Sequence, residues 1–236
     1  YEKRKENVLE NISFTAETGE IVGIIGTTGS GKSSLVQLIP RLYDVTDGEV
    51  LVDGVNVKDY GLKNLRDGVG MVLQKNVLFS GSIEENLRWG DENATMEEIR
   101  AAADAAQADG FVNAFTDGYN MELGQGGVNV SGVQKQRLCI ARALLKKPKI
   151  LILDDSTSAV DTATEAKIRQ AFTTSLKHST KIIIAQRITS VIDADKIIVL
   201  EDGKIIGMGN HNELMKNCEE YRDIYYSQTD KEKEVS

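Results

Sequence analysis

Short apolar segments rich in valine and isoleucine alternate with segments of helical periodicity along this chain of 236 residues. This alternation is typical of a parallel sheet covered by helices, because strands buried on both faces carry nearly continuous apolar runs. We therefore expect an α/β fold. The core strands that the pattern predicts are Ile21–Ile25, Gly70–Leu73, Ile150–Leu153, Lys181–Ala185 and Lys196–Leu200.

The rest of the periodic pattern predicts helices and two short hairpin strands. Gly48–Asp53 and Lys204–Gly207 fit hairpin strands, and the second follows the turn Glu201–Lys204. The last residues, Asp230–Ser236, are charged, so we expect them to fray. The predicted helices begin after Gly31 and near Thr162 and His211, and span Thr95–Gln107, Ser131–Leu145 and Glu219–Tyr226.

The stretch from Lys75 to Val130 has a different character. It is polar and helical in pattern and contains no good strand, and we expect Trp89 to pack inside it. We interpret this stretch as a helical subdomain inserted into the sheet core. The predicted organisation is a single domain over residues 1–236, with its core at about 1–74 and 146–236 and the helical subdomain at about 75–145.

Composition narrows the class of protein. The formal net charge of -8 weighs against nucleic-acid binding, which usually needs a basic face. No apolar run approaches the roughly 20 residues that cross a bilayer, so we expect any membrane-spanning part on a segment outside this chain. Cys139 and Cys218 lack metal-ligand spacing and fit a reducing compartment, with Cys139 as a small buried residue.

The strongest chemical signal is a glycine-rich loop directly after the strand Ile21–Ile25. It matches the pattern G-x-x-x-x-G-K-[ST], in which backbone N–H groups point at phosphate oxygens. Lys32 would reach the β- and γ-phosphates of a nucleotide, and the Ser33 hydroxyl would ligate Mg²⁺. The alternative is a strand-to-helix turn that binds nothing. The loop and its continuation comprise Gly26, Thr27, Thr28, Gly29, Ser30, Gly31, Lys32, Ser33 and Ser34.

A second acidic motif closes the strand Ile150–Leu153. Asp154 and Asp155 follow that strand, and in phosphate-loop enzymes such an aspartate holds Mg²⁺ at the carboxyl edge of the sheet. Taken alone, the motif also fits a strand that is stopped by a charged turn.

The segment Val130–Arg137, with the sequence VSGVQKQR, resembles the L-S-G-G-Q signature of ATP-binding cassette proteins. Other features of that family follow in order. Gln74 resembles the Q-loop glutamine, Ser158–Asp161 the D-loop, and Gln186 stands where the family has its switch histidine. Tyr1, seven residues before Val8, resembles the aromatic residue that stacks on adenine.

The resemblance covers essentially the whole chain and implies a RecA-like phosphate-loop NTPase core with an inserted α-helical subdomain and a small antiparallel β subdomain. It implies ATP and Mg²⁺ as cofactors, held between two such domains paired head to tail. Ser33, Gln74 and Asp154 would then hold the metal, and Lys32, Gln74, Asp155 and Gln186 would act in hydrolysis. The signature and D-loop residues offered to the partner's ATP would be Ser131, Gly132, Val133, Gln134 and Asp161.

Two segments resemble exporters within that family. Val77–Leu87 is similar to the segment that meets the transmembrane part, so the membrane partner is expected near Gln74–Leu87. Glu122–Gly127 is similar to the loop before the signature in exporters. Taken alone, Val77–Phe79 also fits packed core. The resemblance implies an exporter of a small amphipathic or drug-like molecule at the cytoplasmic face of the inner membrane, with its transmembrane domain and one upstream strand outside this sequence.

Three positions depart from the family pattern. Asp155 replaces a glutamate, which shortens the side chain by one methylene, and Gln186 replaces the histidine with an uncharged amide. Both changes fall on one ATP site, which favours the degenerate half of a heterodimer, although a variant in which Asp155 still serves stays open. Val133 replaces the second signature glycine, and its branched side chain would block close backbone approach or a positive φ.

Two other functions remain open at this point. A regulatory subunit that binds ATP without hydrolysing it differs from the exporter motor only in turnover. A family member without membrane helices, acting on ribosomes or DNA, should show a second cassette, an inserted coiled coil or basic arms.

Overall fold

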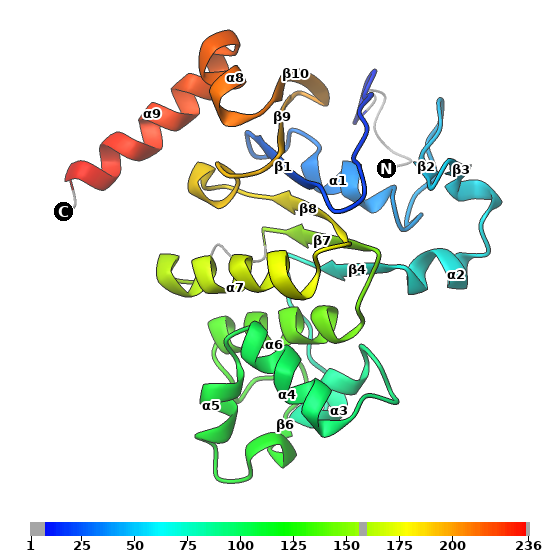
Figure 1. Ribbon diagram of the computed structural model, residues 1–236, viewed down its shortest axis with the longest axis vertical. Coiled ribbons are helices and arrows are strands. Elements are labelled where there is room, and N and C mark those ends of the chain that lie inside the picture. Colours follow the sequence, from blue (N-terminus) through cyan, green and yellow to red (C-terminus); the bar gives the residue numbers. More distant parts are fainter. Residues whose placement is uncertain (1–7, 156–159, 235–236) are drawn as a thin grey trace. The chain divides into compact units, whose positions relative to one another are not determined.

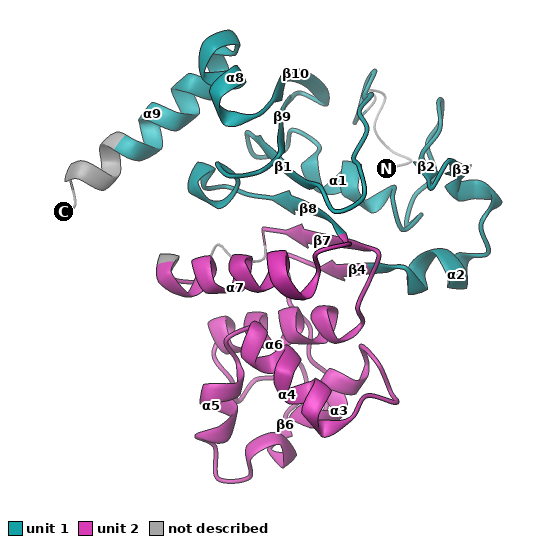
Figure 2. Ribbon diagram, in the orientation of Figure 1, with its two compact units in different colours: residues 1–69, 180–236 teal, residues 70–179 magenta. Residues whose placement is uncertain are grey.

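The computed structural model describes residues 8–155 and 160–234 (Figure 1). The chain divides into two compact units (Figure 2), unit 1 formed by Tyr1–Val69 and Thr180–Ser236 and unit 2 by Gly70–Ser179. Two predicted site positions, Tyr1 and Ser158, lie outside the described residues.

Unit 1 is built on strands in the order β10-β9-β1-β8. β1 (Ile21–Gly26) lies parallel to both β8 (Thr180–Ile184) and β9 (Lys196–Glu201), with Ile24 opposite Ile184 and Ile198. β10 (Lys204–Gly209) runs antiparallel to β9 after a turn in which Asp202 and Gly203 have φ of 42° and 75°. The predicted strands are therefore confirmed to within one or two residues.

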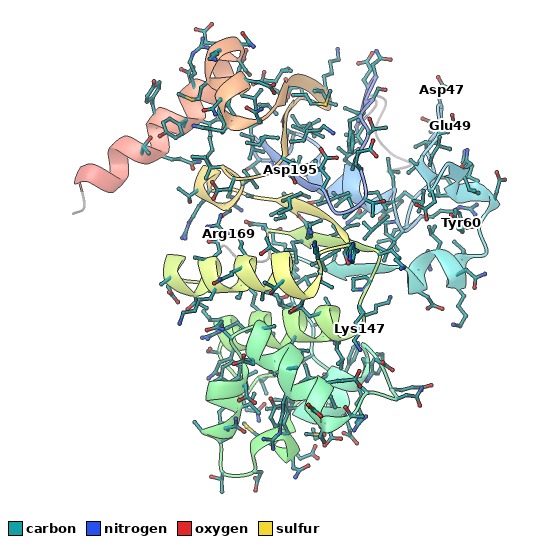
Figure 3. The ribbon with its side chains drawn as sticks, in the orientation of Figure 1. Asp47, Glu49, Tyr60, Lys147, Arg169 and Asp195 are labelled. Carbon is teal, nitrogen blue, oxygen red and sulfur yellow. The ribbon has the colours of Figure 1, made fainter. Side chains whose placement is uncertain are left out.

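The strand β1 is buried along its centre, and this burial explains its sequence. Val22, Ile24 and Ile25 are almost completely enclosed. At Gly23 a Cβ atom would come within 2.6 Å of the Val191 Cβ, so only glycine lets the neighbouring segment pack here. The first amide of the strand, at Ile21, donates to the Asp195 carboxylate at 2.8 Å (Asp195 is labelled in Figure 3).

Smaller elements complete unit 1. The hairpin of β2 (Leu51–Val52) and β3 (Val55–Asn56) confirms the expected small antiparallel part, although its strands are shorter than Gly48–Asp53 suggested. The last helix continues to Glu234 instead of ending at Tyr226, because the charged residues that follow are compatible with a helix. The helical elements of unit 1 are α1 (Lys32–Gln37), η1 (Val57–Asp59), α2 (Leu62–Asp67), η3 (Ile188–Ser190), α8 (His211–Asn217) and α9 (Glu219–Glu234).

Unit 2 combines strands with a helical cluster. β4 (Val69–Val72), which crosses the boundary residue Val69, neighbours β7 (Ile150–Asp154). The helices α3 and α4 pack against α6, and α4 also contacts α7. The helical elements of unit 2 are α3 (Ile83–Arg88), α4 (Met96–Ala105), α5 (Asp109–Asn113), η2 (Gly118–Asn120), α6 (Gly132–Leu145) and α7 (Thr162–Ser175).

Local sequence signals start the helices of unit 2. Ser82, Thr95 and Ser131 are N-caps of α3, α4 and α6, and each forms a capping box with the residue three positions later. The ion pair between Lys147 and Glu98, 2.7 Å long, ties the segment after α6 to α4 (Lys147 is labelled in Figure 3). The hydrogen bond from Lys147 lowers the pKa of Glu98 to about 2, so this carboxylate stays charged at neutral pH.

The expectation that Lys75–Val130 contains no good strand missed one short pairing. β5 (Gly81–Ser82) pairs antiparallel with β6 (Glu122–Leu123), with Gly81 opposite Leu123. Each strand has only two residues, too few to show the alternation by which strands are recognised.

Among the described residues, no helix has both the length and the apolar character needed to cross a membrane.

We expect Gly23→Ala to lower the free energy of unfolding by about 1–3 kcal/mol, because its Cβ would crowd Val191 in a packed core. The matched control is Gly110→Ala, in the exposed part of α5, where an added Cβ has no atom within 4 Å. That variant should be neutral or slightly stabilising, since alanine favours helix more than glycine. Urea unfolding of both variants tests this, and equal stability would show that Val191 moves aside without cost.

Candidate functional site

The glycine-rich loop of unit 1 has the backbone that a phosphate site requires. It joins the end of β1 at Gly26 to the start of α1 at Lys32. Gly26, Gly29 and Gly31 have φ of 149°, 86° and 96°, which side chains rarely tolerate. At Gly26 a Cβ would also lie 1.9 Å from the Leu200 carbonyl oxygen, whereas at Gly29 it would meet no atom within 4 Å. The loop therefore has an open side at Gly29, with Thr27 and Thr28 also exposed.

The Lys32 ammonium is placed over this loop. Its Nζ donates to the carbonyl oxygens of Gly26 at 2.8 Å and Thr27 at 2.7 Å, and to the buried Ser30 hydroxyl at 3.4 Å. A glycine-rich loop at the start of a helix, with an ammonium beside it, is suited to bind phosphate. Ser33 and Ser34 follow Lys32 in the first turn of α1 and are partly exposed.

Gln186 lies at the same edge of the unit 1 sheet as the loop. Ile24 of β1 is opposite Ile184 of β8, and the Ala185 amide donates to the Ile24 carbonyl at 3.1 Å. Gly26 is at the end of β1, and Gln186 comes two residues after the end of β8. Because these two strands are parallel and adjacent, both residues lie at the same edge of the sheet. The side chain of Gln186 is exposed. The register of the sheet thus places Gln186 and the glycine loop at one edge, and the role of Gln186 at an ATP site stays a prediction.

The carboxyl end of β7 in unit 2 carries the acidic pair. Asp154 and Asp155 are 5% and 8% exposed, and Gln74 Nε2 donates to Asp155 Oδ2 at 3.3 Å. Asp155 has φ of 47°, a left-handed conformation that aspartate tolerates better than most residues. Residues 81 positions apart in the sequence are thus joined by a hydrogen bond, and the Q-loop role of Gln74 stays a prediction.

The donor types present suit Mg²⁺. Mg²⁺ takes oxygen ligands, typically one or two carboxylates together with substrate phosphates and water. In unit 2, Asp154 has a carboxylate and Gln74 an amide oxygen, and in unit 1 Ser33 has a hydroxyl; that these three residues hold one metal ion stays a prediction. Within residues 8–155 and 160–234, no group of three or more His, Cys, Asp or Glu side chains is placed to hold a metal ion.

The signature segment starts α6 at an exposed helix end. The Ser131 hydroxyl accepts from the Gln134 amide at 3.2 Å, and the Gln134 side-chain oxygen accepts from the Ser131 amide at 2.9 Å. Ser131 and Gly132 are exposed, and the first turn contains no acidic residue. The helix α6 is 14 residues long, and its amino-terminal end is therefore suited to bind an anion.

One argument about Val133 was wrong. Val133 lies inside α6 and is not among the residues with positive φ, so its backbone needs no glycine. Valine is accommodated because the chain is already helical at this position. The steric objection, that its side chain would face the partner's phosphate, stays a prediction.

Asp161, the D-loop aspartate, is the N-cap of α7. Asp161 Oδ1 accepts from the Thr164 amide at 2.9 Å and caps α7. This backbone hydrogen bond lowers the pKa of Asp161, which is exposed. Its expected contact with nucleotide is not tested by this arrangement and stays a prediction.

An exposed aromatic pair marks the segment expected to meet a membrane partner. Phe79 and Trp89 are 41% and 66% exposed, and their rings stack with centroids 4.4 Å apart. The expectation that Trp89 packs inside the helical subdomain was therefore wrong, because its ring lies on the surface against Phe79. The packed-core alternative for Val77–Phe79 holds only for Leu78, which is 1% exposed, whereas Val77 is exposed like Phe79.

Polar side chains hold this exposed segment in place. The Asn86 side chain accepts from the Phe79 amide at 2.8 Å and donates to the carbonyls of Phe79 and Ser82. Arg142 donates to the Val77 carbonyl at 3.0 Å. Cys139 is buried as expected, and burial raises the pKa of its thiol. The apolar surface is thus presented on a fixed backbone. Neither Asn86 nor Arg142 was singled out from the sequence.

The chain is similar to known transport proteins over nearly its whole length. The family described as ABC transporter matches residues 9–158. The Bacillus subtilis protein YgaD, named as a candidate multidrug export ATP-binding/permease protein, is 47% identical over 95% of this chain and 39% of its own length. The uncharacterized ABC transporter ATP-binding protein YfiB of the same species is 48% identical over 98% of this chain and 40% of its own length.

A solved structure shows the same fold. A bacterial Atm1-family ABC exporter with ATP bound matches with a TM-score of 0.92 and 36% identity, over 96% of this chain and 40% of that chain. This likeness confirms the expected α/β fold of the RecA-like phosphate-loop class. The chain spans 39–40% of the length of these proteins.

We expect Asn86→Ala to lower the free energy of unfolding by about 2–4 kcal/mol, because three hydrogen bonds are lost and backbone groups of Phe79 are left unpaired. Asn64→Ala, on the exposed surface of α2, should change it by less than about 0.5 kcal/mol. Chemical denaturation measures both. A small effect of Asn86→Ala would mean that water or another side chain replaces the Asn86 amide.

Proposed function

Because the chain belongs to the ABC transporter family, we propose that it is the motor domain of an exporter, in which binding and hydrolysis of MgATP move an attached transmembrane part. The observation that carries the proposal is the glycine loop with Lys32 held over it, at the same sheet edge as Gln186. The cargo class that we propose is a small amphipathic or drug-like molecule, in line with the name of the relative YgaD.

Each part of the proposed site has a chemical task. The loop amides and Lys32 bind the β- and γ-phosphates, and Tyr1 stacks on the adenine. Ser33, Asp154 and Gln74 hold the metal, which neutralises charge on the phosphates when it is bound. Asp155 orients the attacking water, and Gln186 donates a hydrogen bond to the γ-phosphate.

The motor works as a pair of domains in this proposal. Ser131, Gly132, Val133, Gln134 and Asp161 serve the ATP held on a second nucleotide-binding domain, so ATP closes the pair and hydrolysis releases it. The exposed start of α6, which has no acidic residue in its first turn, supports this role because such a helix end attracts phosphate. We propose that the partner is a different chain, since both substitutions fall on one of the two sites.

The exposed surface of Val77, Phe79 and Trp89 is the proposed contact with the transmembrane part. Aromatic residues on a rigid backbone are typical centres of protein interfaces. The relatives named ATP-binding/permease proteins are more than twice as long as this chain, which leaves room for that part in the whole protein. The domain would then lie at the cytoplasmic face of the membrane.

We propose that the chain's own ATP site is degenerate. Asp155 carries a short carboxylate that is bonded to Gln74, and a misplacement on the order of 1 Å costs about a hundredfold in rate. Gln186 cannot supply positive charge to the transition state. A regulatory subunit that binds ATP without hydrolysing it is the second candidate, favoured by the same two residues.

A single-turnover experiment tests nucleotide binding and turnover together. Trace MgATP is mixed with excess protein, and the bound nucleotide is analysed over time. We expect ATP to persist on the wild-type chain, and Lys32→Ala to abolish specific binding because the ammonium that contacts the phosphates is lost. Unchanged binding by Lys32→Ala would contradict the phosphate-loop assignment, and conversion to ADP within minutes would contradict the degenerate site.

The double variant Asp155→Glu with Gln186→His should accelerate that turnover by roughly tenfold to a hundredfold, because carboxylate reach and positive charge are both restored. The measurement is the single-turnover rate with the same MgATP. Val133→Gly is the matched control, because it alters only the surface offered to the partner's site. If Val133→Gly alone restores turnover, dimer closure and not Asp155 or Gln186 limits the wild-type chain.

A further inference from the structure

A glutamine of α9 is bonded at two points to the backbone around Gln186. Gln228 Nε2 donates to the Gln186 carbonyl at 2.9 Å, and Gln228 Oε1 accepts from the Ile188 amide at 2.8 Å. One side-chain amide thereby pairs with a carbonyl and an N–H two residues apart, as a neighbouring strand would. We call this pair of bonds the Gln228 clamp.

The clamp acts on the segment nearest the phosphate loop. Gln186 directly follows the Ala185 amide that bonds to Ile24 of β1, and β1 ends at Gly26. Strand pairing therefore fixes the backbone before Gln186, and the clamp fixes it at Gln186 and Ile188. With both sides held, the direction in which the Gln186 side chain leaves the backbone is restricted.

The helix that carries Gln228 is itself anchored. Tyr221 is fully buried, and its hydroxyl makes a hydrogen bond of 2.8 Å with His211 Nδ1 of α8. Arg222 donates to the carbonyls of Met215 and Lys216 at the end of α8. Gln228 lies seven residues after Tyr221, so two turns of helix place both residues on one face. In Figure 1, α9 leads directly away from α8 to the carboxyl end of the described chain.

We propose that Gln228 is a positioning residue for Gln186, so that α9 controls how this site senses the γ-phosphate. The inference rests on the proposed function, because Gln186 has a γ-phosphate to contact only if the loop binds ATP. A purely structural clamp would stabilise α9 and would affect all nucleotides alike. A positioning clamp affects ATP, which has the γ-phosphate, and leaves ADP unchanged.

The test compares MgATP and MgADP affinities of the wild-type chain and of Gln228→Leu. We expect MgATP to bind about threefold to tenfold more weakly, the equivalent of one lost hydrogen bond, and MgADP to change by less than about twofold. In a Gln186→Ala background, Gln228→Leu should not alter the ratio of the two affinities further. Asp223→Leu, an exposed position on the same helix, is the matched control and should leave the ratio unchanged.

Amide hydrogen exchange at Ile188 reports the clamp without nucleotide and should accelerate in Gln228→Leu. If that variant misfolds, Gln228→Glu keeps the oxygen that accepts from Ile188 and removes the donor to Gln186. Equal weakening of MgATP and MgADP, no change in either, or a further change of the ratio in the Gln186→Ala background would overturn the inference. Failure of the proposed function looks different, since the wild-type chain and Lys32→Ala would then bind MgATP equally poorly.

Discussion

The parallel pairing of β1 with β8 and β9 is the constraint on which the nucleotide end of unit 1 depends. It buries β1 and requires glycine at Gly23, where Val191 packs. It brings Leu200 so close to Gly26 that the loop can start only with a residue that has no side chain. The same pairing places Gln186 at the edge of the sheet where the Lys32 ammonium is hydrogen-bonded to the glycine loop. Core packing and phosphate chemistry in this unit are therefore consequences of one strand arrangement.

Unit 2 contributes chemistry of a different kind. Its acidic pair is buried at the end of β7 and is joined to Gln74, whereas its signature segment is exposed at the start of α6. Buried carboxylates with a polar partner suit a metal and a water molecule, because the surrounding groups hold them at fixed positions. An exposed helix start suits an anion brought by another molecule. In the proposed function, the first feature serves a nucleotide on the chain itself and the second a nucleotide on a partner.

Side-chain amides fix backbone segments outside the strands at two places. Asn86 does this for Phe79 in unit 2, and Gln228 does it for Gln186 and Ile188 in unit 1. An amide carries a donor and an acceptor, so it satisfies both kinds of backbone group at once. In both places the fixed segment presents side chains that the proposed function uses. These two amide side chains therefore support segments that the proposed function uses.

The sequence by itself determined the core strands, the longer helices, the glycine loop after β1, the acidic end of β7 and the start of α6, but not the short helices α2, α3 and α5. These features depend on local patterns: apolar runs, capping residues and glycine spacing. It did not reveal the two-residue strands β5 and β6, the exposed Trp89, or the clamps of Asn86 and Gln228. Only the tertiary structure decided those, because each depends on which residues distant in the chain meet, as Gln228 meets Gln186 across 42 positions. Val133 also shows what residue type alone cannot decide. Its branched side chain suggested a conflict with a positive φ, but its backbone is helical and needs no positive φ.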